Sequence, residues 1–200
     1  GHLLFELAEN LAAQGADVTV LTCRPSYGPP ETWQECPRHE FRNGVRVKRL
    51  WSTRMSKDNL IGRVLNSVTF LVPLTLLHVL PRRRREVFLY TTNPPYLGFV
   101  GAFVSLIRRH NYVVLLHDSY PELAVWVGKI KKGGFIDRIW KWCNKIMYKR
   151  AKQTIVLSDA AKRLVCNNYG SDPDRIHVIP NWADPDELVP KPKTQSAFAE

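Results

Sequence analysis

Short apolar runs of strand length alternate with segments of helical periodicity along this chain. Residues 112–117 read YVVLLH and residues 154–158 read TIVLS, so both runs are apolar over most of their length. A strand with water on one face alternates apolar and polar residues, so a continuous apolar run indicates a strand covered on both faces. Because helical patterns separate these runs, the sequence predicts an α/β class domain with a doubly wound parallel sheet.

The expected elements can be given by residue range. Strands are expected at 17–23, 45–51, 87–91, 112–117, 154–157 and 176–180, and helices at 2–14, 59–80, 94–109, 119–127, 135–150 and 158–169. Residues 24–43 are rich in Pro, Gly and polar residues, and we expect a loop there. A doubly wound domain normally opens with a strand and a loop, whereas this sequence opens in a helical pattern. We therefore expect a first strand ahead of Gly1 that is missing from this sequence.

The net charge of the chain limits the kinds of partner that it is expected to bind. The 200 residues include 29 Lys and Arg but 18 Asp and Glu, for a formal net charge of +11. Such an excess predicts an anionic partner: a phosphorylated substrate, an acidic lipid surface or a nucleic acid. The sequence has no helix-turn-helix, RNP or zinc-finger signature, and much of the basic charge follows apolar segments. We therefore expect no nucleic-acid partner.

Motifs for several enzyme classes are missing. The sequence contains no G-x-S-x-G elbow, no P-loop and no complete G-x-G-x-x-G, so it lacks the marks of hydrolases, kinases and NAD enzymes. Its four cysteines (Cys23, Cys36, Cys143 and Cys166) form no C-x-x-C pair and have no histidine at metal-ligand spacing. We expect free thiols in a reducing compartment and no metal site.

Apolar segments followed by basic clusters raise the question of a membrane. Residues 64–80 approach the roughly 20 apolar residues of a spanning helix, but Pro73 and several polar residues interrupt them. Their place between two strands favours a crossover helix. Three apolar segments end in basic residues, and the third, 135–150, is a basic amphipathic helix with tryptophans. The residues expected to contact an anionic membrane are Arg82, Arg83, Arg84, Arg85, Trp140, Lys141, Trp142 and Lys145.

A plainer interpretation of these helices remains open. Any helix packed on a sheet has an apolar inner face and a charged outer face. Basic residues near a helix C-terminus also complement the helix dipole. The sequence alone does not choose between packing against the sheet and contact with a membrane.

Three turns follow predicted strands, where open parallel sheets bind their ligands. In the first, Asn93 can cap a helix that begins in Pro94-Pro95. In the second, His117 and Asp118 end the most apolar strand, and an imidazole and a carboxylate there can bind a substrate or move a proton. Ser119 and Glu122 follow with the spacing of a capping box. The third turn places Ser158 at a helix start.

These segments, taken in order, resemble one enzyme family. The opening HLLFELAENLAAQGADVTVLT resembles the first helix and strand of family-4 retaining glycosyltransferases of the GT-B type. TTNPPYLGFVGAF and YVVLLHDSYPEL are similar to segments of the subgroup that builds exopolysaccharide, capsule and O-antigen units on polyprenyl carriers. VLSDAAKRLV and DRIHVIPNWAD resemble the Val-x-Ser helix start and the Val-Ile-Pro-Asn segment that leads into the second domain.

The resemblance implies a domain organisation and a reaction. Residues 1–186 would form the Rossmann-like, acceptor-side half of a GT-B fold, and residues 187–200 would begin the linker to a second domain that holds the nucleotide-sugar. The reaction would transfer a sugar with retention to a polyprenyl-diphosphate-linked glycan, without a metal or other cofactor. The enzyme would be cytoplasmic and peripheral on the inner face of the plasma membrane.

The resemblance also implies roles for single residues. His117 or Asp118 would contact the donor sugar at the reacting centre. The substrate or acceptor would be bound by Gly1, Asn93, Tyr96, Tyr120, Ser158 and Asn181. The subgroup often has Arg immediately before this Asp, where this sequence has His117, whereas other branches place a functional His at this strand end. The alternative to an enzyme is a non-catalytic basic α/β module that binds a membrane or a partner.

Overall fold

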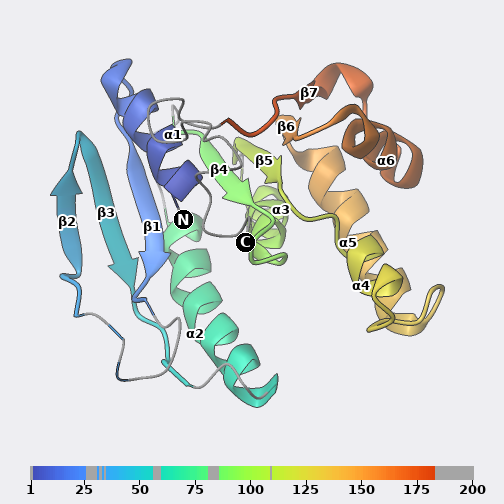
Figure 1. Cartoon of the computed structure of the whole chain (residues 1–200), viewed down its shortest axis with the longest axis horizontal. Helices are drawn as coiled ribbons and strands as arrows, with labels where there is room; N and C mark the ends of the chain where they lie inside the picture. The colour runs from blue at the N-terminus through green and yellow to red at the C-terminus, as the bar shows by residue number, and fades with distance from the viewer. Residues whose placement is uncertain are drawn as a thin grey trace, which may run out of the picture.

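The computed structural model describes residues 2–25, 31, 33, 35–55, 60–80, 86–108 and 110–182. Its strands form two sheets flanked by helices (Figure 1). The first sheet has the order β1-β3-β2, with β1 at Thr19–Cys23, β2 at His39–Arg42 and β3 at Val45–Leu50. The second has the order β4-β5-β6-β7, with β4 at Phe88–Thr91, β5 at Tyr112–Leu116, β6 at Gln153–Val156 and β7 at Ile176–Val178.

The helices follow the predicted alternation. They are α1 (His2–Ala13), α2 (Leu60–Val79), α3 (Leu97–Ile107), α4 (Glu122–Trp126), α5 (Phe135–Arg150) and α6 (Asp159–Tyr169), with a 3₁₀ turn at Pro173–Arg175. All pairs in the second sheet are parallel, which confirms the predicted doubly wound α/β arrangement. The expected strand ahead of α1 stays a prediction. Within the described residues, β1 pairs only with β3, and β4 pairs only with β5.

The predicted loop at 24–43 is wrong at its C-terminal end. Residues His39–Arg42 form β2, which pairs antiparallel with β3 so that Arg42 lies opposite Val45. Asn43 and Gly44 join the two strands, with φ of 48° and 79°. Positive φ at both residues of a two-residue turn matches the right-handed twist of a hairpin, and Asn-Gly is the sequence that tolerates it best.

The main core lies around the second sheet. Tyr112, Val114 and Val156 are fully buried there with Val104 of α3 and Val165 of α6. Helix α3 approaches β4 and β5 closely at Gly101, where an added Cβ would lie 2.7 Å from the Tyr90 ring. The first sheet has a much smaller cluster, in which Ala8, Val45 and Val47 are buried.

Helix α2 occupies the crossover position predicted for 59–80. It packs Phe70 and Leu74 into the main core and leaves Ile61, Val72 and Leu76 more than half exposed. No helix in the described part of the chain is long and apolar enough to span a bilayer.

Candidate functional site

Most of the predicted site residues lie at one edge of the second sheet, where its strands have their carboxyl ends. Because β4, β5, β6 and β7 are parallel, the turns that follow them lie side by side. These turns carry Asn93, His117 with Asp118, Ser158 and Asn181 in the order of the strands. Gly1, which we predicted to bind the substrate or acceptor, lies outside the described residues.

The turn after β5 is held by a threonine from the neighbouring strand. Thr92 directly follows β4 and is 3 % exposed. Its hydroxyl oxygen accepts the backbone N–H groups of His117 at 2.9 Å and of Asp118 at 3.1 Å. Its own N–H donates to the Leu115 carbonyl at 3.1 Å. Thr92 therefore fixes the backbone from which the two candidate catalytic side chains extend. Our sequence reasoning missed it, although a polar residue at the end of an apolar strand is the signal that could have found it.

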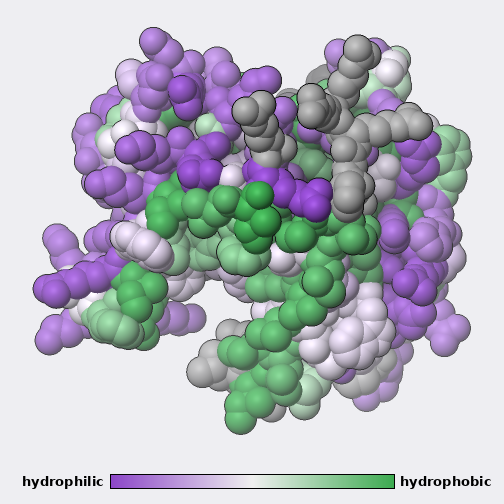
Figure 2. Space-filling view, turned by 180° about the vertical axis from the view of Figure 1, so that it is seen from behind, coloured by the Kyte–Doolittle hydropathy of each residue, from purple (hydrophilic) through white to green (hydrophobic). Residues whose placement is uncertain are grey.

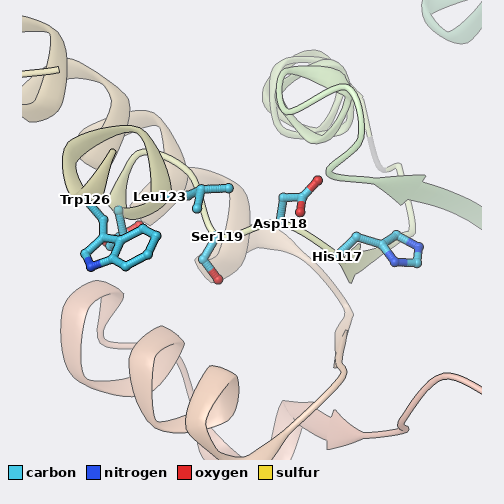
Figure 3. A pocket seen from close by; sticks show the side chains of 6 residues that line it. His117, Asp118, Ser119, Leu123 and Trp126 are labelled. Carbon is cyan, nitrogen blue, oxygen red and sulfur yellow. The ribbon is translucent and has the colours of Figure 1, made fainter. Parts of the chain in front are cut away.

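An open pocket of about 540 Å³ lies along this turn (Figure 3). Its lining runs from the end of β5 into α4 and consists of His117, Asp118, Ser119, Glu122, Leu123 and Trp126. The His117 Nε2 atom is buried, and within the described residues it has no hydrogen-bond partner. A histidine ring can bind a hydroxyl or a phosphate oxygen of a ligand, and Asp118 lines the same pocket. The pocket thus has the groups that polar substrates require.

Glu122 anchors the wall of the pocket. The capping box predicted for Ser119 and Glu122 is wrong, because Pro121 occupies the N-cap of α4 and no side chain caps that helix. Glu122 instead accepts hydrogen bonds from the Tyr169 hydroxyl at 2.7 Å and from Asn168 at 3.1 Å. Burial raises the pKa of Tyr169, so its phenol stays protonated and donates to this carboxylate.

Asn144 completes this anchor from α5. Its amide donates to the Tyr120 carbonyl at 2.6 Å and to the Tyr169 hydroxyl at 3.0 Å. The segment after β5 is therefore tied to both α5 and α6. Asn144 is 2 % exposed, and such a buried amide has to be matched by polar partners.

The other predicted substrate residues are not among those that line the pocket. The Tyr96 hydroxyl donates to Ser67 of α2, and burial raises its pKa. The Tyr120 ring stacks on Trp140 with 5.7 Å between ring centroids. Ser158 caps α6 by accepting the Ala161 N–H at 3.2 Å, as its position at the helix start predicts.

Asn93 is exposed and does not cap α3, so that prediction is wrong. Residues 94–96 form a turn, with the Leu97 N–H donating to the Pro94 carbonyl at 3.3 Å, and the helix begins only at Leu97. The N-cap is therefore Tyr96, which makes no side-chain cap. Substrate binding by these residues and by Asn181 stays a prediction.

The predicted membrane-contact residues divide into two kinds. Trp142 and Lys145 are exposed on α5. Trp140 is stacked on Tyr120, and Lys141 pairs with the carboxylate of Asp137 at 3.0 Å. Arg82 to Arg85 lie outside the described residues. Within the described ranges, no group of three or more His, Cys, Asp or Glu side chains could hold a metal ion.

The sequence comparison decides the family. Residues 3–182 match the model of the glycosyl transferase 4-like domain. The chain belongs to that family. The match covers α1, both sheets and the whole edge that carries His117 and Asp118. The predicted relationship to family-4 glycosyltransferases is therefore confirmed, and so is the predicted Rossmann-like fold.

Two curated relatives of this family-4 domain extend the comparison. The chain is 28 % identical over 149 residues to the probable glycosyltransferase WbjE of Pseudomonas aeruginosa, covering 72 % of this chain and 36 % of that protein. It is 29 % identical over 90 residues to alpha-maltose-1-phosphate synthase of Mycolicibacterium smegmatis, covering 44 % of this chain and 22 % of that protein. The matched part therefore spans 36 % of the length of the first relative and 22 % of the second.

Proposed function

We propose that this protein transfers a sugar from a nucleotide-sugar to a glycan acceptor linked to polyprenyl diphosphate, with retention of configuration. The described domain would be the acceptor-side half, and a second domain after residue 186 would hold the donor nucleotide. Membership of the glycosyl transferase 4-like family and the two glycan-related relatives support the reaction class. We further propose that the product is used in cell-surface polysaccharide synthesis.

The observation that carries this proposal is the turn of His117 and Asp118, held by Thr92 beside an open pocket. Sugar transfer requires a group near the positively charged sugar centre and a group that orients the acceptor hydroxyl. The carboxylate of Asp118 suits the first requirement, and the imidazole of His117 suits the second because it lines the same pocket and can hydrogen-bond a hydroxyl. Closure of a second domain over the pocket would exclude water from the reacting groups.

The proposed location is the cytoplasmic face of the plasma membrane, with the protein bound peripherally. The net charge of +11 supports an anionic surface as a partner. A lipid-linked acceptor would be presented from that surface, which explains why an acceptor-binding domain should be both basic and partly apolar.

The test is a transfer assay with the full-length protein, a panel of nucleotide-sugars and polyprenyl-diphosphate-linked acceptors. Asp118→Asn and His117→Ala should each lower the rate about 10²–10⁴-fold, the range expected for groups that act directly on the reaction. His177→Ala is a matched control, because this exposed histidine on β7 bonds to Gln153 at 2.8 Å. It should leave the rate unchanged.

Two outcomes would contradict the proposal. Equal rates for wild type and Asp118→Asn would show that the turn takes no part in the reaction. Absence of transfer with every donor, in a protein that still binds a membrane or a protein partner, would favour the non-catalytic module. The anomeric configuration of the product, read by NMR, tests retention separately.

A further inference from the structure

Large apolar side chains face solvent on α4 and α5. Trp126 is 84 % exposed, Phe135 79 % and Trp142 64 %. We define the α4–α5 surface as these residues together with the exposed neighbours Val127, Ile136 and Ile139. On α5, positions 135, 139 and 142 have the i, i+4, i+7 spacing of one helical stripe. Exposure of so many aromatic residues on one helix pair marks a surface that binds something.

The inner face of α5 is formed by other residues. Asp137 and Asn144 are 2 % exposed, and Met147 is 1 % exposed against the main core. The buried polar residues are tied to the protein, since Asp137 Oδ2 accepts the Gly133 N–H at 2.8 Å and Asn144 donates to the Tyr120 carbonyl. Packing on the protein therefore accounts for only part of the apolar content of α5. The stripe of Phe135 and Trp142 is not used by the core.

The surroundings of the α4–α5 surface are strongly basic. Residues 126–149 contain seven Lys and Arg and a single acidic residue, Asp137. Lys141 neutralises that residue. Although burial opposes its ionisation, the Gly133 N–H and Lys141 hold the pKa of Asp137 below its ordinary value. On α5, Arg138, Lys145 and Lys149 repeat at helical spacing next to the apolar stripe, and all three are exposed. A basic stripe beside an aromatic one matches the edge of an anionic bilayer, where phosphates lie next to acyl chains.

Helix α2 provides the contrast. It also exposes an apolar stripe, which includes Ile61, Val72 and Leu76. Its sequence, LIGRVLNSVTFLVPLTLLHV, contains one arginine and no lysine. In Figure 2, α2 is a continuous green ridge, whereas the α4–α5 end of the molecule mixes green with purple. Basic residues interspersed along the helix therefore distinguish α5 from α2, whose basic cluster, Arg82 to Arg85, follows the helix and lies outside the described residues.

We propose that the α4–α5 surface docks the protein on an anionic phospholipid surface, with Trp126, Phe135 and Trp142 at the level of the headgroups. The surface is continuous with the candidate site, because Trp126 also lines the pocket of His117 and Asp118. Docking would place that pocket at the membrane, within reach of the sugar of a lipid-linked acceptor. This purpose rests on the proposed function, but the docking itself is measured without any donor sugar.

The experiment is co-sedimentation of the full-length protein with phosphatidylglycerol-containing vesicles and with pure phosphatidylcholine vesicles, at low and moderate salt. Wild type should bind the anionic vesicles and lose affinity as salt rises. The double variant Phe135→Ser/Trp142→Ser should bind about tenfold or more weakly, because two large apolar groups are lost. Lys145→Gln should weaken binding about fivefold, as expected for one charge near a lipid surface.

The matched control is Val72→Ser/Leu76→Ser, which removes two exposed apolar side chains from α2. It should bind vesicles like wild type. All these positions are exposed, and circular dichroism checks that each variant folds. Binding lost in the α2 variant but kept in the α5 variant would overturn the proposal. So would a lack of binding to any vesicle, or a dimer in solution that the Trp142 change dissociates.

The two proposals fail in different ways. Vesicle binding that depends on Phe135 and Trp142, in a protein without transferase activity, would leave the docking surface standing and remove the proposed function. Asp118-dependent transfer to a water-soluble acceptor analogue, without vesicle binding, would leave the proposed function standing and remove the docking surface.

Discussion

The two sheets of this domain are built by different means. In the second sheet, every strand pair is parallel, and β5 is covered on both faces by a core that includes Tyr112, Val114 and Val156. The first sheet has one antiparallel hairpin, and its own cluster buries Ala8, Val45 and Val47. The candidate catalytic turn extends from the better-packed sheet. The proposed chemistry would therefore lie on the part of the domain that can hold side chains most rigidly.

The largest expected difference comes from one matched pair of core substitutions. Val114 and Val45 are both fully buried, the first in the second sheet and the second in the first. Val114→Ala should lower the free energy of unfolding by about 2–3 kcal/mol, because the dense core around it cannot collapse into the cavity. Val45→Ala should cost about 1–2 kcal/mol, since its partly exposed neighbours can relax. Chemical denaturation followed by tryptophan fluorescence measures both, and equal losses would contradict the contrast.

The hairpin turn is the next place to test the first sheet. Gly44 has φ of +79°, and an added Cβ would lie 3.2 Å from the Cβ of Ala12. Gly44→Ala should therefore cost about 1–2 kcal/mol from the left-handed backbone, with an added cost from the contact. Gly128→Ala is the control for the cost of the left-handed backbone alone, because Gly128 has φ of +74° and open space around it. Hydrogen exchange should quicken at β2 and β3 but not at β5, and quickening at β5 would show that the two sheets unfold as one unit.

The smallest expected effect concerns the second sheet. Ser158→Ala removes the side chain that caps α6 and should lower the free energy of unfolding by about 1 kcal/mol. Ser158→Asp keeps an oxygen acceptor at the same position and should restore most of that stability. Thermal unfolding of the three proteins measures the effect. If Asp fails to rescue, the serine hydroxyl acts in some way other than capping.

The second sheet was predictable because its strands carry a strong local signal. The apolar runs at β5 and β6 indicate buried strands on their own. The structure places β5 within its predicted range and begins β6 one residue before its range, at Gln153. Strand β2, with the sequence HEFR, has no such pattern, and most of its side chains are exposed. The Asn43-Gly44 pair was the signal available, since this dipeptide favours two-residue hairpins.

Contacts between distant segments account for the errors in the candidate site. The capping prediction for Glu122 failed because its carboxylate instead accepts a hydrogen bond from Tyr169, which lies 47 residues away in the sequence. Thr92 gains its role only when β4 and β5 lie side by side. On α5, a helical projection groups Phe135 and Met147 on one broad apolar face, but the fold buries only Met147. Local pattern cannot tell which part of such a face meets the core.

The one-sided pairing of β1 has a practical consequence. Within the described residues, β1 has a sheet neighbour, β3, on one side only. Such edges are templates for strands from other molecules. We therefore expect the second edge of β1 to accept an added strand, through backbone hydrogen bonds that detergent would not reverse as it reverses contacts between apolar surfaces.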